Sequence, residues 1–397
     1  MQTQFPKRGF ERNEFVSRVE KAQETISKCQ LDAILISTEA DIRYFTGFMT
    51  QFWQSPTRPW FVIILPEVAP IAVIPSIGIR LMQDCYISEI YSWSSPDEFD
   101  DGIGLLLRVI DENLSPGLKR VGLLMGKETS FRAPLADILK LTAPDTKMQI
   151  SDVTSEIQQI RMKKSEPEIE KLKFVCGIVS QVFEDLPNWL LEKLPLSELF
   201  RTFKIKALEL GVDDVSYLVG SAGQGGYFDI IAPPTSRFLR SGDIFMLDTG
   251  CVWDGYFSDF DRNFALKSAS NEAFEAHKKL IDATVTAVDS IVPGKTTSQD
   301  LFRVMSEVIY PNIDPSDLKI DNVGRLGHGL GIQLTEPPSH TSWDTTVLQP
   351  SMTLTIEPSI FYGKESFLMV AEENILITKV GVEYLSKPCN RDLKVIK

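Results

Sequence analysis

The sequence predicts two domains, an α/β domain followed by an α+β domain. At 397 residues the chain exceeds what one hydrophobic core usually supports. Helix and strand patterns alternate through residues 1–160, which is typical of a mixed sheet covered by helices. From residue 161 onward, long helices are followed by groups of strands and turns. We therefore expect the domains to span residues 1–160 and 161–397.

Composition and charge restrict the partners of this chain. The formal charge of −13 at pH 7 disfavours nucleic acid and anionic membranes, because both bind basic surfaces. The most apolar stretch, residues 60–79, contains three prolines, so it predicts two strands and a turn rather than a membrane span. The N-terminus shows no apolar signal segment. Five scattered cysteines indicate free thiols, so a cytoplasmic location is expected.

Apolar spacing predicts the elements of both domains in order. In the first domain, helices are expected at residues 14–29 and 97–114, and strands at 32–37, 61–65, 71–74 and 120–124. The second domain opens with Ser165-Glu-Pro, which is a helix-start pattern. Its helices are expected from 165 through 182, at 196–210 and at 271–291, with strands and turns in 218–267 and 323–386. This order predicts two similar halves.

The segment from Ile244 to Phe264 predicts a β-hairpin that carries two acids. Its turn is indicated by Asp254-Gly255, and Asp248 and Asp259 fall on the two sides of that turn. The neighbouring inward positions are apolar. Because buried carboxylates are costly when unpartnered, these two require a cation, a hydrogen-bond network or a metal.

Three later residues extend this acidic pair. His328 lies between glycines, Glu357 ends an alternating strand, and Glu372 stands at the entrance of another apolar strand. Taken singly, each has an ordinary structural explanation, such as a turn cap or an ion pair. Together they form a hard, oxygen-rich ligand set that suits two divalent ions, which are Mn²⁺, Co²⁺, Fe²⁺ or Zn²⁺.

The order Asp, Asp, His, Glu, Glu resembles that of the pita-bread metallohydrolases, which include methionine aminopeptidase, aminopeptidase P, prolidase and the creatinase relatives. The eleven-residue step from Asp248 to Asp259 matches their hairpin. GHGLG, TIEP and AEENILIT resemble their later motifs, and IRMKKSEPEIEKLK resembles their helix start. The resemblance implies a creatinase-like N-terminal domain and a pita-bread C-terminal domain.

The resemblance also implies a role for each ligand. Asp248 would bind one ion, His328 and Glu357 the other, and Asp259 and Glu372 would bridge the pair. A hydroxide between the ions would be the nucleophile, and Glu357 would exchange a proton with that water.

The chain departs from this family in its other histidines. Prolidase-like enzymes carry one in the loop before the first aspartate, but residues 220–238 contain none. They carry another seven residues after the metal histidine, where this chain has Thr335. His340 is the one candidate to replace it, as a catalytic residue, with a loop position as the alternative. His277 lies on the polar part of a helix and is expected to be solvated.

Other residues lie near the predicted ligands or offer groups to a substrate. Asp261 stands where relatives usually have Thr, either as an additional ligand or beside the ligands, and Glu373 is expected outside the ligand set. Arg58, between Trp53 and Trp60, offers a guanidinium and aromatic faces to a zwitterionic substrate. In relatives this region reaches a neighbouring subunit, so its role requires a homodimer. The alternative is a loop packed by its own aromatics.

The sequence thus predicts a dinuclear-metal hydrolase resembling Xaa-Pro peptidases, which cleaves an amide bond of a short peptide or peptide-like substrate. Glu357 and His340 are the expected catalytic residues, and Arg58, Trp53 and Thr335 the expected substrate-binding ones. The alternative is a lyase or hydrolase of the same fold that acts on a small zwitterionic or nitrogen-rich compound. A third possibility is a binding protein that has lost catalysis.

Overall fold

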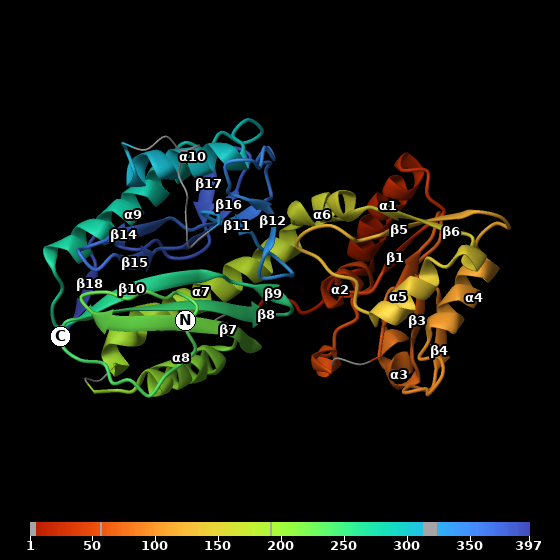
Figure 1. The fold of residues 1–397 in the computed structure, drawn as a ribbon, viewed down its shortest axis with the longest axis horizontal. Coiled ribbons are helices and arrows are strands. Elements are labelled where there is room, and N and C mark those ends of the chain that lie inside the picture. Colours follow the sequence, from red (N-terminus) through yellow and green to blue (C-terminus); the bar gives the residue numbers. More distant parts are fainter. Residues whose placement is uncertain (1–4, 56–57, 191–192, 313–323) are drawn as a thin grey trace. The chain divides into compact units, whose positions relative to one another are not determined.

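The computed structural model describes residues 5–55, 58–190, 193–312 and 324–397 and forms two compact units. The N-terminal unit is Lys7–Arg161 (Figure 1). The C-terminal unit is Met162–Lys397, with which Phe5 and Pro6 are grouped. Phe5 belongs there because its ring packs on Phe174, at 5.2 Å between centroids.

A six-stranded mixed sheet forms the centre of the N-terminal unit, in the order β4-β3-β2-β1-β5-β6. β1 pairs antiparallel with β2 and parallel with β5. The central strands are buried along their whole length, as expected for strands covered on both faces. The elements are α1 (Arg12–Lys28), β1 (Ala33–Ile36), α2 (Glu39–Thr46), β2 (Phe61–Ile64), β3 (Ile71–Pro75), α3 (Ile79–Met82), β4 (Glu89–Trp93), α4 (Ile103–Asn113), β5 (Lys119–Leu123), α5 (Leu135–Leu141), β6 (Met148–Asp152) and α6 (Thr154–Met162), with short 3-10 turns at Gln51–Gln54, Ser76–Gly78 and Pro144–Thr146.

In the C-terminal unit, α7 and α8 pack on the strands of the first half (Figure 1). α9 packs on the two-stranded sheet β14-β15, and α10 packs on α9. The elements are α7 (Glu166–Trp189), α8 (Leu196–Leu210), β7 (Asp214–Gln224), β8 (Asp243–Trp253), β9 (Tyr256–Phe257), β10 (Phe260–Leu266), α9 (Asn271–Asp289), α10 (Ser298–Ile309), β11 (His328–Gly329), β12 (Glu336–Ser339), β13 (Thr353–Ile356), β14 (Ser359–Tyr362), β15 (Phe367–Val370), β16 (Glu373–Ile377), β17 (Val382–Tyr384) and β18 (Lys394–Ile396).

The two larger sheets carry the strands on which the site is built. The first has the order β18-β10-β8-β7, and the second has the order β12-β11-β13-β16-β17. The predicted helices and strand groups are therefore confirmed. α10 was not expected, although Thr297 and Asp300 form a capping box at its start, which is a recognisable helix-start pattern.

The predicted hairpin forms around a tight turn between β8 and β9. Asp254 and Gly255 have φ of 46° and 83°, the left-handed values that a type I′ turn requires at both central positions. Asp248 lies on β8, whereas Asp259 lies in the two-residue break between β9 and β10. Asp261, two residues later on β10, is directly opposite Asp248.

Candidate metal centre

The five predicted ligands all lie on or beside strands of the two larger sheets. Asp248 and His328 are within β8 and β11. Asp259 immediately precedes β10, Glu357 immediately follows β13, and Glu372 immediately precedes β16. At such positions, hydrogen bonds between paired strands hold the main chain, while the side chain points away from the paired main chains.

Three of these side chains form a buried cluster of metal-ligating atoms. One ligand atom from each of Asp259, His328 and Glu372 lies within 4.8 Å of the other two. Nε2 of His328 is 3.4 Å from Oδ2 of Asp259, and its Nδ1 lies 2.9 Å from the Gly329 carbonyl oxygen. Because that carbonyl requires a proton on Nδ1, the lone pair of Nε2 points at the carboxylate. Two acceptors that face each other in this way favour a cation between them.

The glycines on either side of His328 allow the main chain to pass close to other strands. Gly327 has a φ of 129°, and a Cβ there would lie 2.4 Å from the Thr355 carbonyl oxygen. A Cβ on Gly329 would lie 2.3 Å from the Pro337 carbonyl oxygen. Any larger residue at either position would therefore displace the imidazole-bearing strand.

The acids of the cluster and their neighbours hold protons more tightly than ordinary carboxyl groups. Burial raises the pKa of Asp248 to about 7, and burial together with the Asp248 charge raises that of Glu357 to about 8. Burial and neighbouring carboxylates raise the pKa of Asp259 and Glu372 well above the usual range. These charge interactions mean that Asp248 and Glu357 lie within electrostatic range of the three clustered residues. Positive ions at the site would relieve the repulsion.

Two buried oxygens show that the residues fit metal ions. Oδ1 of Asp248 and Oε1 of Glu372 have no hydrogen-bond partner among the described residues. Leaving such acceptors without a partner is expensive in a protein interior. The His328 imidazole is also suited to a metal, because burial lowers its pKa to about 3 and so keeps it neutral. Carboxylates with a neutral imidazole are a donor set for Mn²⁺, Co²⁺, Fe²⁺ or Zn²⁺.

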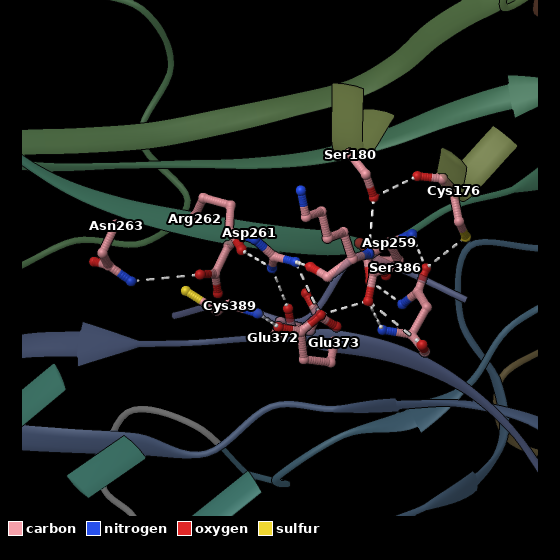
Figure 2. A network of polar contacts seen from close by, with 12 residues as sticks. Cys176, Ser180, Asp259, Asp261, Arg262, Asn263, Glu372, Glu373, Ser386 and Cys389 are labelled. Carbon is pink, nitrogen blue, oxygen red and sulfur yellow. Dashed lines mark hydrogen bonds and ion pairs between the residues drawn. The ribbon is translucent and has the colours of Figure 1, made fainter. Parts of the chain in front are cut away.

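Arg262 holds the strands that carry the acids (Figure 2). Its Nη1 donates to the main-chain oxygens of Asp261 at 2.6 Å and Glu372 at 2.8 Å. Its Nη2 donates to Glu373 Oε2 at 2.9 Å and to the Lys387 oxygen at 2.6 Å. Glu373 is therefore a buried ion-pair partner outside the clustered residues, as expected. Sequence reasoning did not single out Arg262.

Asn374 provides a second hydrogen-bonded link between the segments that carry the proposed ligands. Its Oδ1 accepts a hydrogen bond from the Asp259 amide at 2.9 Å, and its Nδ2 donates to the Asp259 oxygen. The Cys176 thiol donates to the same Oδ1 at 3.3 Å. Asn374 thus fixes the main chain of one clustered acid from β16, two residues after Glu372. In the sequence, its position beside the AEE motif was the only feature that could have indicated this role.

Asp261 lies at the edge of the acidic group and has its own partners. Asn263 Nδ2 is 3.5 Å from Asp261 Oδ1, and the Tyr227 hydroxyl donates to Asn263 Oδ1 at 2.6 Å. Burial and the charge of Asp248 raise the pKa of Asp261 well above its usual range. Whether it binds a metal stays a prediction.

Two histidines outside the cluster are buried. His277 is 1% exposed, so the expectation of a solvated side chain was wrong. Its ring contacts the Arg391 oxygen at 3.2 Å and the Cys389 sulfur at 3.7 Å, because the C-terminal segment covers this face of α9. His340 is fully buried.

The ring of His340 is held on both sides. Its Nδ1 is 2.6 Å from the Ser298 hydroxyl and its Nε2 is 3.0 Å from the Thr355 oxygen. Both nitrogens are therefore engaged within the fold, and neither is available to a substrate in this conformation. The catalytic role of His340 stays a prediction, and it would require the ring to leave these two contacts.

Thr335 is half-buried and faces a residue that the sequence did not indicate. Nη2 of Arg325 lies 3.3 Å from its hydroxyl. The positive charge of Arg325 offsets part of the rise in the pKa of Asp259 and Glu357, and it adds to the burial that lowers the pKa of His328. Arg325 is therefore within electrostatic range of the acidic group. It precedes the GHG motif by two residues, but arginine before a strand is too common to signal a site.

Arg58 and Trp53 belong to the N-terminal unit. Arg58 stacks on Phe52 at 5.2 Å, and the Arg132 guanidinium lies 5.1 Å from the Trp53 ring. Trp60 is 2% exposed and packs on Trp53, at 5.7 Å between centroids. These rings are thus engaged by their own loop and by Arg132, and a substrate role for the loop stays a prediction.

The fold and the clustered ligands together define a two-domain protein with a candidate metal centre. The chain belongs to the metallopeptidase family M24, which it matches over residues 170–379. Residues 18–163 match the creatinase/prolidase N-terminal domain. The predicted family and fold are therefore confirmed.

Similar proteins cover nearly the whole chain. An Xaa-Pro dipeptidase of Pyrococcus horikoshii is 25% identical over 381 residues, which is 93% of this chain and 97% of that protein. The crystal structure of recombinant prolidase from Thermococcus sibiricus has a TM-score of 0.84 at 23% identity, covering 98% of this chain and 100% of that one. The N-terminal domain of FACT complex subunit SPT16 from chickpea (Cicer arietinum) has a TM-score of 0.76 at 15% identity, covering 98% and 100%. The two structures show a shared fold.

In the described residues, no helix combines the length and the apolar character needed to cross a membrane.

Proposed function

We propose that this protein is a metal-dependent peptidase that hydrolyses the amide bond of Xaa-Pro dipeptides or similarly short peptides. The observation that carries the proposal is the buried group of Asp259, His328 and Glu372, whose ligand atoms lie within 4.8 Å of one another. Membership of the M24 family supports it. The P. horikoshii relative is named an Xaa-Pro dipeptidase.

The proposed centre holds two divalent ions. Asp248 would bind one ion, His328 and Glu357 the other, and Asp259 and Glu372 both. The unpartnered oxygens of Asp248 and Glu372 support this assignment, because each is a buried acceptor without a donor. Mn²⁺ is the first ion to test, followed by Co²⁺, Fe²⁺ and Zn²⁺.

When bound, such ions would activate water near neutral pH and polarise the scissile carbonyl. The residues of the chain supply proton exchange and the positioning of the ligands. Glu357 is the residue proposed to exchange a proton with the attacking water, because its carboxyl group is buried and lies within range of the Asp248 charge. Arg262 and Asn374 fix the main chain of Glu372 and Asp259, so both acids are held in place before a substrate arrives.

The test measures metal content and product release together. The protein is loaded with Mn²⁺ or Co²⁺, and release of proline from Xaa-Pro dipeptides and of the N-terminal residue from Xaa-Pro tripeptides is followed. We expect metal-dependent cleavage that falls about 100-fold or more in Asp259→Ala. The exposed acid Asp289 provides the matched control, Asp289→Ala, which should retain activity. Bound metal without turnover of any such peptide would remove the peptidase proposal.

A second candidate is a lyase or hydrolase of a small zwitterionic or nitrogen-rich compound. One observation favours it, since the rings of His277 and His340 are both engaged inside the fold. The same metal-loaded protein is therefore assayed with betaine-like compounds. Turnover of these without peptide cleavage would establish the second candidate. Purification without stoichiometric metal would instead favour a binding protein.

We further propose a cytoplasmic homodimer. All five cysteines are free thiols, which suits a reducing compartment. Light scattering coupled to size-exclusion chromatography measures the assembly, and a monomer would exclude any role for Arg58 in a neighbouring subunit.

A further inference from the structure

A cavity of about 170 Å³ lies between α7, β10 and the C-terminal segment 387–394. None of the five proposed metal ligands, all of which are described residues, lines it. Phe183 of α7 and Arg262 and Phe264 of β10 form its buried part, and each is at most 8% exposed. The two rings lie 6.4 Å apart between centroids at an angle of 26°. The floor of the cavity is therefore largely aromatic and apolar.

The mouth of this cavity carries both signs of charge. Asp392 and Lys394 line it from the C-terminal segment, and both side chains are exposed. Neither has an ion-pair partner within the part of the chain that the structure describes. Glu184 and Lys387, which also line the cavity, form an ion pair with each other. One carboxylate and one ammonium group thus remain for a ligand.

This combination suits a free α-amino acid with an apolar side chain. Its ammonium group would pair with Asp392, its carboxylate with Lys394, and its side chain would pack on the aromatic floor. A ligand with a single charge would leave one of the two residues without a partner. The volume of about 170 Å³ is below the roughly 300–1,000 Å³ of sites for drug-sized ligands, which restricts the occupant to a molecule of amino-acid size.

The cavity shares two residues with the contacts that hold the acids of the proposed metal centre (Figure 2). Arg262 donates to the Glu372 oxygen at 2.8 Å, and the Cys389 amide donates to Glu373 Oε1 at 2.6 Å. A ligand in the cavity would restrain both Arg262 and the segment around Cys389. It would therefore favour the arrangement in which Glu372 is held for a metal ion. By linkage, each ligand would raise the affinity for the other by the same factor.

We infer that this cavity binds a free amino acid with an apolar side chain, and that its occupancy increases the affinity of the proposed centre for metal. The site goes beyond the proposed function, because it contains none of the proposed ligands. Hydrolysis of an Xaa-Pro dipeptide consumes one water molecule and releases two amino acids. A role for the cavity in sensing these products rests on the proposed function.

The first experiment measures L-leucine binding to the Mn²⁺-loaded full chain by isothermal titration calorimetry. Asp392→Asn and Lys394→Gln should each weaken binding about 10-fold. Leucinamide, which lacks the carboxylate, and 4-methylpentanoate, which lacks the ammonium group, should bind the wild type similarly weakly. The matched controls Asp289→Asn and Lys364→Gln change exposed residues outside the cavity and should bind leucine normally. Absence of leucine binding in the wild type, or equal affinity in both cavity variants, would overturn the inference.

A second variant separates this cavity from the proposed metal centre. Asp259→Ala disables the centre but leaves the lining of the cavity intact, so it should bind leucine within about 5-fold of the wild type. Loss of leucine binding in this variant would place the amino acid at the metal centre and would overturn the proposed site.

The last experiment measures the coupling. Competition with a fluorescent chelator gives the Mn²⁺ affinity with and without a leucine concentration that saturates the wild type. Leucine should raise this affinity about 5-fold, and it should have no effect in the double variant Asp392→Asn/Lys394→Gln. Equal Mn²⁺ affinities in the wild type would refute the coupling. If the wild type cleaves no Xaa-Pro peptide, the proposed function fails, whereas the two binding measurements still decide the amino-acid site.

Discussion

Replacing Arg262 by alanine should strongly destabilise the C-terminal unit. The substitution removes donors to three main-chain oxygens, those of Asp261, Glu372 and Lys387. It also leaves the carboxylate of Glu373, 4% exposed, without its ion-pair partner. Stranding one charge of a buried pair costs about 3–5 kcal/mol. At about 2–4 °C per kcal/mol for a domain of this size, Tm should fall by about 10 °C.

Differential scanning calorimetry of the metal-free protein measures this effect. The control is Arg391→Ala, because Arg391 and Asp282 form an exposed pair with side chains 57% and 39% exposed, and solvent screens such a pair so that it adds little stability. Adding Glu373→Gln to Arg262→Ala removes the stranded charge and should recover more than half of the loss. If Arg262→Ala and Arg391→Ala lowered Tm equally, the argument that Arg262 holds the ligand strands would be refuted.

Three further predictions concern the metal centre. In chelated protein, the raised pKa values of Asp248 and Glu357, about 7 and 8, mean that the native state keeps protons that the unfolded chain has lost. Tm should therefore fall between pH 7 and 8.5. Below pH 7 the buried His277, His328 and His340, whose pKa values are lowered to about 4, 3 and 4, contribute a slope of the opposite sign, because the unfolded chain protonates them and the native state does not. Mn²⁺ should reverse the trend because its binding displaces those protons, and a flat or rising Tm in chelated protein would contradict the reasoning. Asp259→Asn should bind fewer than two Mn²⁺ per chain by elemental analysis, and full occupancy would exclude a shared ligand. His340→Ala should lose about 2–4 kcal/mol of stability in calorimetry but little kcat, and a large loss of kcat in the folded variant would restore its catalytic role.

The ligand pattern could be predicted because each motif is local. The turn at Asp254-Gly255 needs only two residues to be recognised, and it places Asp248 and Asp259 on opposite sides of the hairpin. The glycines beside His328 likewise imply close main-chain contacts, and the structure contains them. Short-range patterns of this kind also predicted the helix at Ser165.

The remainder of the site depends on contacts between distant segments. The sequence indicated a solvated His277 because this residue lies on the polar face of α9. In the structure, the chain near residues 389–391 packs on that face. The sequence did not indicate Arg325, because its contacts include the side chains of Thr335 and Ser339, which strand pairing brings near. Pairings between distant segments leave no periodic pattern in the sequence. These contacts could therefore be identified only from the structure.

The partners of Arg262 and Glu373 have a consequence for biosynthesis. The Lys387 oxygen, the Ser386 hydroxyl and the Cys389 amide complete this network, and all three follow the last proposed ligand, Glu372, in the chain. A ribosome therefore produces all five proposed ligands before it produces the segment that fastens them. An ion captured by the nascent chain before that point would meet ligands whose main chain is not yet held by these contacts.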